Sequence, residues 1–221
     1  SCALGWACWK TYVGRPETDR FRTNAMKLLG SGLFDAKRHE DALSVREAEL
    51  SMARRLGAQE EHILAVQGNL ANAYQMLGRP EAVRMRRDVY SGCLKLNGEE
   101  HRETLLQANN YASLLKQQKR FEEAKSLMRK SIPIARRVLG ESHDLTLTMR
   151  RTYAVALYGD ANATIDDLRE AVTTLEDAGK IARRVFGGSH PTTAGLERVL
   201  EDARAALRAH EGDVESWSVW L

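Results

Sequence analysis

The amino-acid sequence predicts an all-α fold of antiparallel helix hairpins that stack one on the next. In residues 101–140, two amphipathic helical patterns flank a short polar turn. A helix-ending glycine recurs at spacings of 41, 42 and 47 residues, at Gly57, Gly98, Gly140 and Gly187. An alanine precedes each glycine by 15 or 16 residues, at Ala42, Ala82, Ala124 and Ala171. One hairpin cannot bury both of its faces, so four aligned copies indicate a helical repeat array.

Residues 101–140 define the repeating unit. The apolar stripe of its first helix is Leu105, Leu106, Ala108, Tyr111, Ala112, Leu114 and Leu115. The stripe of its second helix is Phe121, Ala124, Leu127, Met128, Ile132 and Ala135. Only the polar turn 117–120 separates them, so the two helices must be antiparallel neighbours.

Residues 1–16 are predicted to be the tail of a second helix from a preceding repeat, or an N-terminal cap. Leu4, Ala7, Cys8 and Val13 lie near one helical face, with Trp6, Trp9 and Tyr12 beside it. A frayed terminus is the alternative for this segment.

The array itself is predicted to span residues 17–209, beginning with repeats 17–57 and 58–98. Thr18 or Asp19 can cap the first helix. Gly30 stands where the next repeats have a small alanine, and glycine costs about 1 kcal/mol against alanine in a helix. The second repeat has lost one residue in its turn at 77–80, where Pro80 suits the start of the following helix.

The next repeats are 99–140 and 141–187. Pro133 is expected to bend the second helix of the third repeat. Five extra residues fall in the turn of the fourth repeat, after which Thr164 or Asp166 can begin the next helix. A cap helix is predicted at 192–209, because Glu201 stands where the repeats have alanine and a carboxylate suits an outer surface. Residues 210–221 are predicted to be a C-terminal tail, either loose or docked.

This pattern resembles the tetratricopeptide repeat (TPR), in the form of roughly 42 residues found in kinesin light chains. The residues that carry the resemblance are Asn69-Leu-Ala71, Tyr74, Gly78 and Ala82, then Asn110-Tyr-Ala112, Leu115 and Phe121-Glu-Glu-Ala124, and the Ala-Arg-Arg-Val-Leu-Gly that ends at Gly140. The resemblance implies a right-handed α-solenoid whose first helices line a concave groove.

Composition excludes several classes of function. The chain has 221 residues and a net charge of +3, which is too small to indicate a nucleic-acid-binding surface. No apolar run is long enough to span a bilayer. Three cysteines, Cys2, Cys8 and Cys93, lack metal-binding spacing and leave one unpaired. They favour a reducing, cytoplasmic setting.

Two repeated polar features are interpreted as structural. Histidines recur once per repeat, too far apart to share one metal ion, and are expected to cap first helices, at His62, His101, His143 and His190. Arginine pairs fall in the last turns of second helices, where the helix dipole favours cations by about 0.3–1 kcal/mol, at Arg54-Arg55, Arg136-Arg137 and Arg183-Arg184. The alternative for the arginine pairs is a basic rim for acidic partners or RNA.

No phosphate loop, nucleophile elbow or Cys–His arrangement occurs, so no catalytic residue, metal site or cofactor is predicted.

The resemblance implies that first-helix side chains face the groove and contact a peptide or a partner helix. The matching positions are Asn24, Lys27, Ser31, Asn69, Asn72, Asn109, Asn110, Ser113, Gln117, Arg151 and Thr152. Amides both donate and accept, so a row of them can bind a peptide backbone without fixing its sequence. Alternatively, the asparagines bond neighbouring helices. Arg151 is expected to contact an acidic group. Ala65 and Leu106 replace the lysine that carboxylate-clamping TPRs need, so that class of ligand is not expected.

The sequence therefore predicts a non-catalytic protein–protein interaction module or scaffold that binds a peptide or protein partner, with no small-molecule substrate and no membrane. One alternative is a recruiting domain within a larger multidomain protein, which could be an enzyme. A helical repeat that binds RNA is a weaker alternative, and its affinity would fall steeply with salt.

Overall fold

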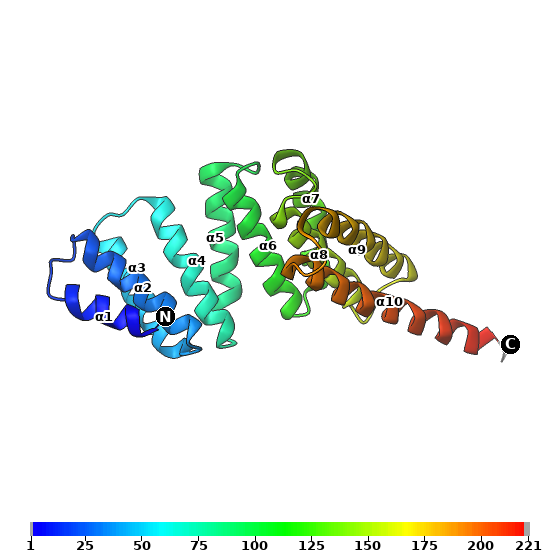
Figure 1. Ribbon diagram of the computed structural model, residues 1–221, viewed down its shortest axis with the longest axis horizontal. Coiled ribbons are helices and arrows are strands. Elements are labelled where there is room, and N and C mark those ends of the chain that lie inside the picture. The colour runs from blue at the N-terminus through cyan, green and yellow to red at the C-terminus, as the bar shows by residue number, and fades with distance from the viewer. Residues whose placement is uncertain (1, 219–221) are drawn as a thin grey trace. The chain divides into compact units, whose positions relative to one another are not determined.

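A computed structural model describes residues 2–218, which form ten α-helices joined by short turns (Figure 1). The predicted all-α class is confirmed. The helices form two compact units, unit 1 (residues 1–96) and unit 2 (residues 97–221). The first five helices are α1 (Cys2–Tyr12), α2 (Arg20–Asp35), α3 (His39–Arg55), α4 (Glu60–Met76) and α5 (Glu81–Asn97). The remaining five are α6 (Arg102–Gln117), α7 (Phe121–Val138), α8 (Asp144–Tyr158), α9 (Ile165–Phe186) and α10 (Pro191–Ser218).

Backbone conformation explains why the repeat glycines recur. Gly57, Gly98, Gly140 and Gly187 all have positive φ, between 63° and 96°, a region that glycine adopts without strain. Inside three hairpins, the turn also contains one residue of positive φ, at Lys37, Gly78 and Lys119. Lys37 and Gly78 are 41 positions apart, and so are Gly78 and Lys119. The hairpin turns therefore recur with nearly the same period as the helices.

The repeat histidines cap helices, as predicted, at three of their four positions. The Nδ1 atoms of His101, His143 and His190 accept hydrogen bonds from the backbone N–H two residues later, at 3.1–3.3 Å. His62 instead lies in the first turn of α4, which begins at Glu60. Within the described residues, no three histidine, cysteine or carboxylate side chains come close enough to hold a metal ion.

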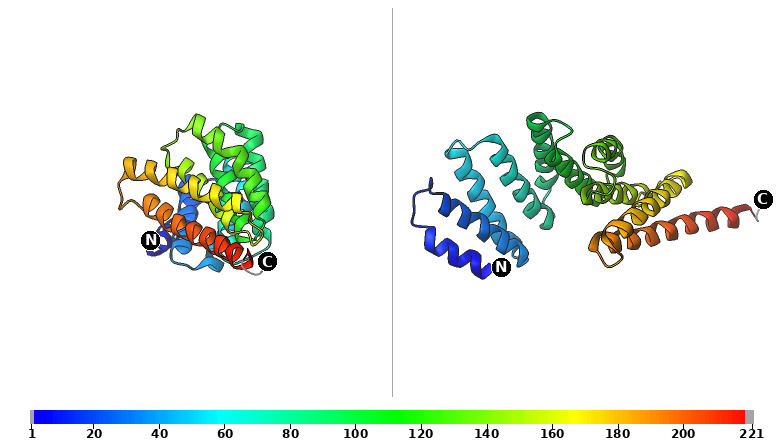
Figure 2. Two further views of the ribbon diagram at one scale, coloured as in Figure 1. Left: turned by 90° about the vertical axis from the view of Figure 1, so that its right-hand side faces the viewer. Right: turned by 45° about the horizontal axis from the view of Figure 1, so that its top comes forward.

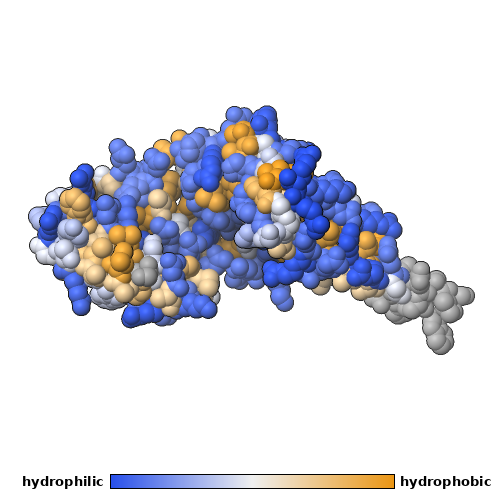
Figure 3. Space-filling view, in the orientation of Figure 1, coloured by the Kyte–Doolittle hydropathy of each residue, from blue (hydrophilic) through white to orange (hydrophobic). Residues whose placement is uncertain are grey.

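Unit 1 begins with α1 packed closely on α2. A side chain at Gly5 would come within 2.8 Å of the backbone of Leu29, so Gly5 permits this approach. Cys2 and Trp9 pack against the core that Leu29 and Leu33 form. The face of α1 that carries Cys2, Gly5 and Trp9 therefore packs inward. Leu4 is 66% exposed, because the close approach at Gly5 turns the face of Cys2, Gly5 and Trp9 inward. Figure 3 shows apolar surface over α1.

The core of unit 1 continues between α3 and α4. Leu43 and Leu50 of α3 pack against Val66, Leu70 and Ala73 of α4. The helix α2 is capped by Asp19, whose side chain accepts hydrogen bonds from the backbone amides of Phe21 and Arg22. Of the two candidate caps, Asp19 is therefore the one used.

In unit 2, each helix from α6 to α10 packs against the next, and α8 also contacts α6 and α10. The views in Figure 2 show α9 and α10 side by side. The helix α7 continues as one element through Pro133. A capping box begins α9, in which Thr164 and Asp167 each accept a backbone hydrogen bond from the other. Thr164 is thus the start of this helix.

The last helix is longer than predicted. We expected a cap helix at 192–209, but α10 runs from Pro191 to Ser218 and includes much of the predicted tail 210–221. Within the predicted tail the one glycine, Gly212, costs a helix about 1 kcal/mol, and no proline follows in the sequence to end it. Residues 219–221 lie outside the described residues. Glu201 is exposed, as expected of a cap, and pairs with Arg204 at 3.0 Å.

Candidate functional site

Five predicted groove residues lie on α2 and α4, the first helices of the repeats in unit 1. Asn24 is exposed and Lys27 half-buried on α2. On α4, Asn69 is exposed and Asn72 half-buried. Asn69, Asn72 and Ser31 line a common cavity of about 90 Å³ between the two helices. The structure therefore brings the two asparagines together with Ser31, and leaves Asn24 and Lys27 one to two turns away along α2.

A buried arginine forms part of this cavity. Arg46 of α3 is 5% exposed and donates to Glu49 at 2.7 Å and to Ser31 at 2.8 Å. Gly30 makes room for it, because a side chain there would come within 2.9 Å of the guanidinium. The small residue at position 30 thus accommodates a charge, which the sequence alone did not reveal.

The second repeat contains a related arrangement. Arg86 of α5 is buried and donates hydrogen bonds to the side-chain oxygens of Asn72 and Gln75. Burial lowers the pKa of Arg86 to about 10. The oxygen of Asn72 is therefore already engaged by the protein, and its NH₂ group remains as the donor that could meet a ligand.

In unit 2, Asn109 and Thr152 are buried and bonded to each other. The hydroxyl of Thr152 on α8 donates to the side-chain oxygen of Asn109 on α6 at 2.9 Å. This pair matches the alternative in which repeat asparagines brace neighbouring helices. Asn110 and Ser113 are half-buried on α6, and Gln117 is exposed at its end.

Arg151 lies between α8 and α10, beside a cavity of about 210 Å³. Leu147, Thr148, Pro191, Thr192 and Leu196 complete the lining. A side chain at Gly195 would come within 2.7 Å of the Arg151 guanidinium, so the glycine leaves space for it. Arg151 forms no ion pair with any described residue. Burial lowers the pKa of Lys116 on α6, and the nearby charge of Arg151 lowers it further. Two cations therefore lie close together here.

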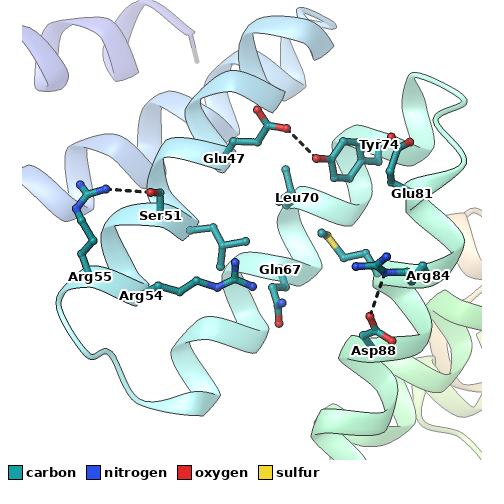
Figure 4. Close-up of a pocket in the computed structure, with 12 residues that line it drawn as sticks. Glu47, Ser51, Arg54, Arg55, Gln67, Leu70, Tyr74, Glu81, Arg84 and Asp88 are labelled. Carbon is teal, nitrogen blue, oxygen red and sulfur yellow. Dashed lines mark hydrogen bonds and ion pairs between the residues drawn. The ribbon is translucent and has the colours of Figure 1, made fainter.

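A cavity larger than the two beside Asn69 and Arg151 lies elsewhere in unit 1, between α3, α4 and α5 (Figure 4). Its volume is about 640 Å³, and Leu50, Leu70 and Met85 contribute its apolar lining. Sequence reasoning missed it. The available signal was Tyr74, a residue with a polar tip where the aligned positions of the other repeats have leucine, at Leu33, Leu115 and Leu157.

Comparison with known proteins supports the repeat assignment. The sequence profile of the tetratricopeptide repeat matches residues 102–164. No curated protein matches the chain. No helix in residues 2–218 has both the length and the apolar character needed to cross a membrane.

Solved structures share the fold. BtubC (BKLC) from P. vanneervenii has a TM-score of 0.73 at 18% identity, covering 97% of this chain and 87% of that one. A kinesin light chain from Podosopora anserina with nearly identical TPR-like repeats has a TM-score of 0.73 at 22% identity, covering 88% and 90%. A Rap protein complexed with competence and sporulation factor has a TM-score of 0.57 at 18% identity, covering 91% and 56%. The predicted fold class, an α-solenoid of antiparallel hairpins, is confirmed.

Proposed function

Because residues 102–164 are tetratricopeptide repeats and the chain has the fold of kinesin-light-chain-type repeat proteins, we propose that it is a non-catalytic scaffold. Its partner is a peptide or a segment of a protein, held against the first helices of the repeats. The observation that carries this proposal is Arg151, a half-buried guanidinium beside a cavity between two helices, with no carboxylate partner among the described residues.

The chemistry of these first helices suits a peptide. Arg151 offers a planar set of donors that fits a carboxylate or a pair of carbonyl oxygens. Asn69 is exposed, and its amide can donate to and accept from a peptide backbone. The NH₂ group of Asn72 adds a second donor beside it. Within each unit, such polar contacts lie on the first helices and favour a peptide over a small molecule.

Other residues predicted for the site have a supporting part in this proposal. Asn109 and Thr152 hold α6 against α8 and so fix the position of Arg151 on α8. Asn110 donates to Gln107 at 3.5 Å, and Gln107 donates to Glu103 at 2.7 Å. This row of polar groups along α6 orients the Asn110 amide for a ligand.

The related Rap protein was solved in complex with competence and sporulation factor, so a chain of this fold can hold another molecule. The three cysteines are an odd number without metal-binding spacing, which supports a cytoplasmic location.

The test is a pull-down from cell lysate with the wild-type chain and an Asn69→Ala/Asn110→Ala/Arg151→Ala variant. A matched control is Lys95→Ala/Lys130→Ala/Arg184→Ala, which changes three exposed residues of second helices. Circular dichroism checks that all three proteins are folded. We expect partners that the wild type and the control retain and the first variant loses. Equal retention by all three proteins would contradict a site on the first helices.

A further inference from the structure

The large cavity of unit 1 has an apolar floor. Leu50 of α3, Leu70 of α4 and Met85 of α5 form it, above the core of the unit. Its volume of about 640 Å³ lies within the range of about 300–1,000 Å³ typical of ligand-binding pockets. The floor is therefore large enough to receive more than one apolar side chain.

One end of this cavity is acidic. Glu47 of α3 and Glu81 of α5 stand on opposite walls, with Tyr74 of α4 between them (Figure 4). The hydroxyl of Tyr74 donates to Glu47 at 2.7 Å. Neither glutamate forms an ion pair with a residue that the structure describes. Two exposed carboxylates are thus available to a cation at this end.

The other end is basic. Arg54, in the last turn of α3, lines the cavity and has no ion-pair partner within the described part of the chain. Its neighbour Arg55 is bound to Glu17 at 2.9 Å. Across the cavity, Asp88 lies 3.9 Å from Arg84 and 3.6 Å from Arg87, so Arg84 already has a carboxylate near it. Arg54 is therefore the cation at this end that is available to an acidic group of a partner.

The walls are held in place by contacts outside the cavity. A side chain at Gly92 would come within 2.5 Å of the Leu64 methyl, so α5 and α4 meet tightly there. Val89 and Cys93 pack against the same leucine. Met85 of the cavity lining packs against the same cluster, so these contacts join α4 to α5 beside the cavity.

From this arrangement we propose that the cavity between α3, α4 and α5 is a second docking site, which receives an amphipathic helix with a basic residue at one end and an acidic residue at the other. The basic residue meets Glu47 and Glu81, and the acidic residue meets Arg54. Apolar residues between them pack on Leu70 and Met85. This site lies between the second helices α3 and α5 and the face of α4 that carries Leu70 and Tyr74, and it is separate from the peptide site proposed at Asn69 and Asn72.

The spacing of the charges favours a helical partner. Glu47 and Arg54 are seven residues apart on α3, which is roughly 10 Å along the axis at about 1.5 Å per residue. A helix lying along α3 presents matching charges at positions i and i+7, with apolar residues at i+3 and i+4. These are the positions that share one helical face in helix-in-groove recognition.

Two synthetic alanine-based peptides of 15 residues test the proposal. Both carry leucine at i+3 and i+4. The first has lysine at i and glutamate at i+7, and the second has glutamate at both. Methyl-labelled full-length protein is titrated with each, and chemical shifts are followed at Leu50, Leu70 and Met85. We expect shifts at these methyl groups, and binding of the first peptide roughly fivefold tighter than the second, since exposed charge pairs each contribute a few-fold.

A charge-reversed protein makes the test decisive. In Glu47→Arg/Glu81→Arg both ends of the cavity are basic, so the preference should reverse in favour of the second peptide. Glu61→Arg/Glu99→Arg has the same net charge at exposed positions that do not line the cavity, and it should keep the wild-type preference. Circular dichroism confirms that both variants are folded.

Three results would overturn the proposal: no shifts at the floor methyl groups at millimolar peptide, equal affinity for both peptides, or a preference that the charge reversal leaves unchanged. Arg151→Ala in unit 2 should not affect either peptide. The proposed peptide site on the first helices is tested separately, so either proposal can be contradicted while the other stands.

Discussion

Asn109 and Thr152 connect two first helices of unit 2 by one buried hydrogen bond of 2.9 Å between the Thr152 hydroxyl and the Asn109 side-chain oxygen. Both residues were predicted to contact a ligand, yet here the two side chains satisfy each other. Since buried polar atoms are costly when unpaired, the bond fixes α6 relative to α8. It therefore determines where Arg151, the residue before Thr152, is presented.

Removing this bond should destabilise unit 2. In Thr152→Val the shape of the side chain is kept, but the oxygen of Asn109 loses its donor. We expect a loss of about 1–3 kcal/mol in the free energy of unfolding, measured by urea denaturation followed by circular dichroism. Thr148→Val, at a half-buried position one turn earlier, serves as the control and should change stability far less. Equal effects of the two substitutions would show that the bond does not stabilise the unit.

The buried Arg46–Glu49 pair leads to a second prediction. Arg46→Met leaves the Glu49 carboxylate, which is 1% exposed, without its cation, so we expect a loss of about 3–5 kcal/mol. Changing both residues, as Arg46→Met/Glu49→Leu, should recover most of this loss, because the third repeat has the fully buried Met128 at the position of Arg46. Urea denaturation of the wild type and of both variants measures it. A double variant no more stable than Arg46→Met would contradict this explanation.

Most of the repeat architecture could be predicted from the sequence. The period of the glycines and alanines follows directly from local physics, since each second helix must end and each hairpin must pack closely. The histidines of three repeats were correctly interpreted as caps, because a side-chain acceptor before a first helix has a local role. Such features depend on neighbours within a few residues, and a single sequence reveals them.

The features that were missed depend on contacts between helices. Whether α1 would pack through Leu4 or through Gly5 depends on how closely α2 approaches it. Gly30 was interpreted as a weak copy of alanine, whereas its space is filled by Arg46 from the next helix. The cavity above Leu70 arises where three helices meet. A periodic pattern shows which residues face inward, but it does not show what faces them.

Acid should weaken the start of α9. Burial by itself raises the pKa of Asp167, but hydrogen bonds from Thr164 and the charges of Lys125 and Arg129 together hold it below its ordinary value of 3.8. Because the folded pKa is the lower one, the carboxylate stabilises the protein above pH 3.8, and this contribution is lost as the pH falls further. We expect Asp167→Asn to be less stable than wild type at pH 7, and the difference to shrink below pH 3.8. Thermal unfolding across this range measures it, and a difference independent of pH would contradict the assignment.

Gly195→Ala should change stability and binding in opposite directions. Alanine favours a helix by about 1 kcal/mol over glycine, so α10 should become equally or more stable. The new methyl group would come within 2.7 Å of the Arg151 guanidinium, and that flexible side chain must move aside. If Arg151 contacts the partner as proposed, affinity for a partner captured by the wild type should fall about as far as in Arg151→Ala. Gly179→Ala on α9, where nothing lies within 4 Å of the added carbon, is the matched control and should leave binding unchanged. A Gly195→Ala protein that binds as tightly as wild type, while Arg151→Ala does not, would show that the position of the guanidinium beside α10 is not what the partner recognises.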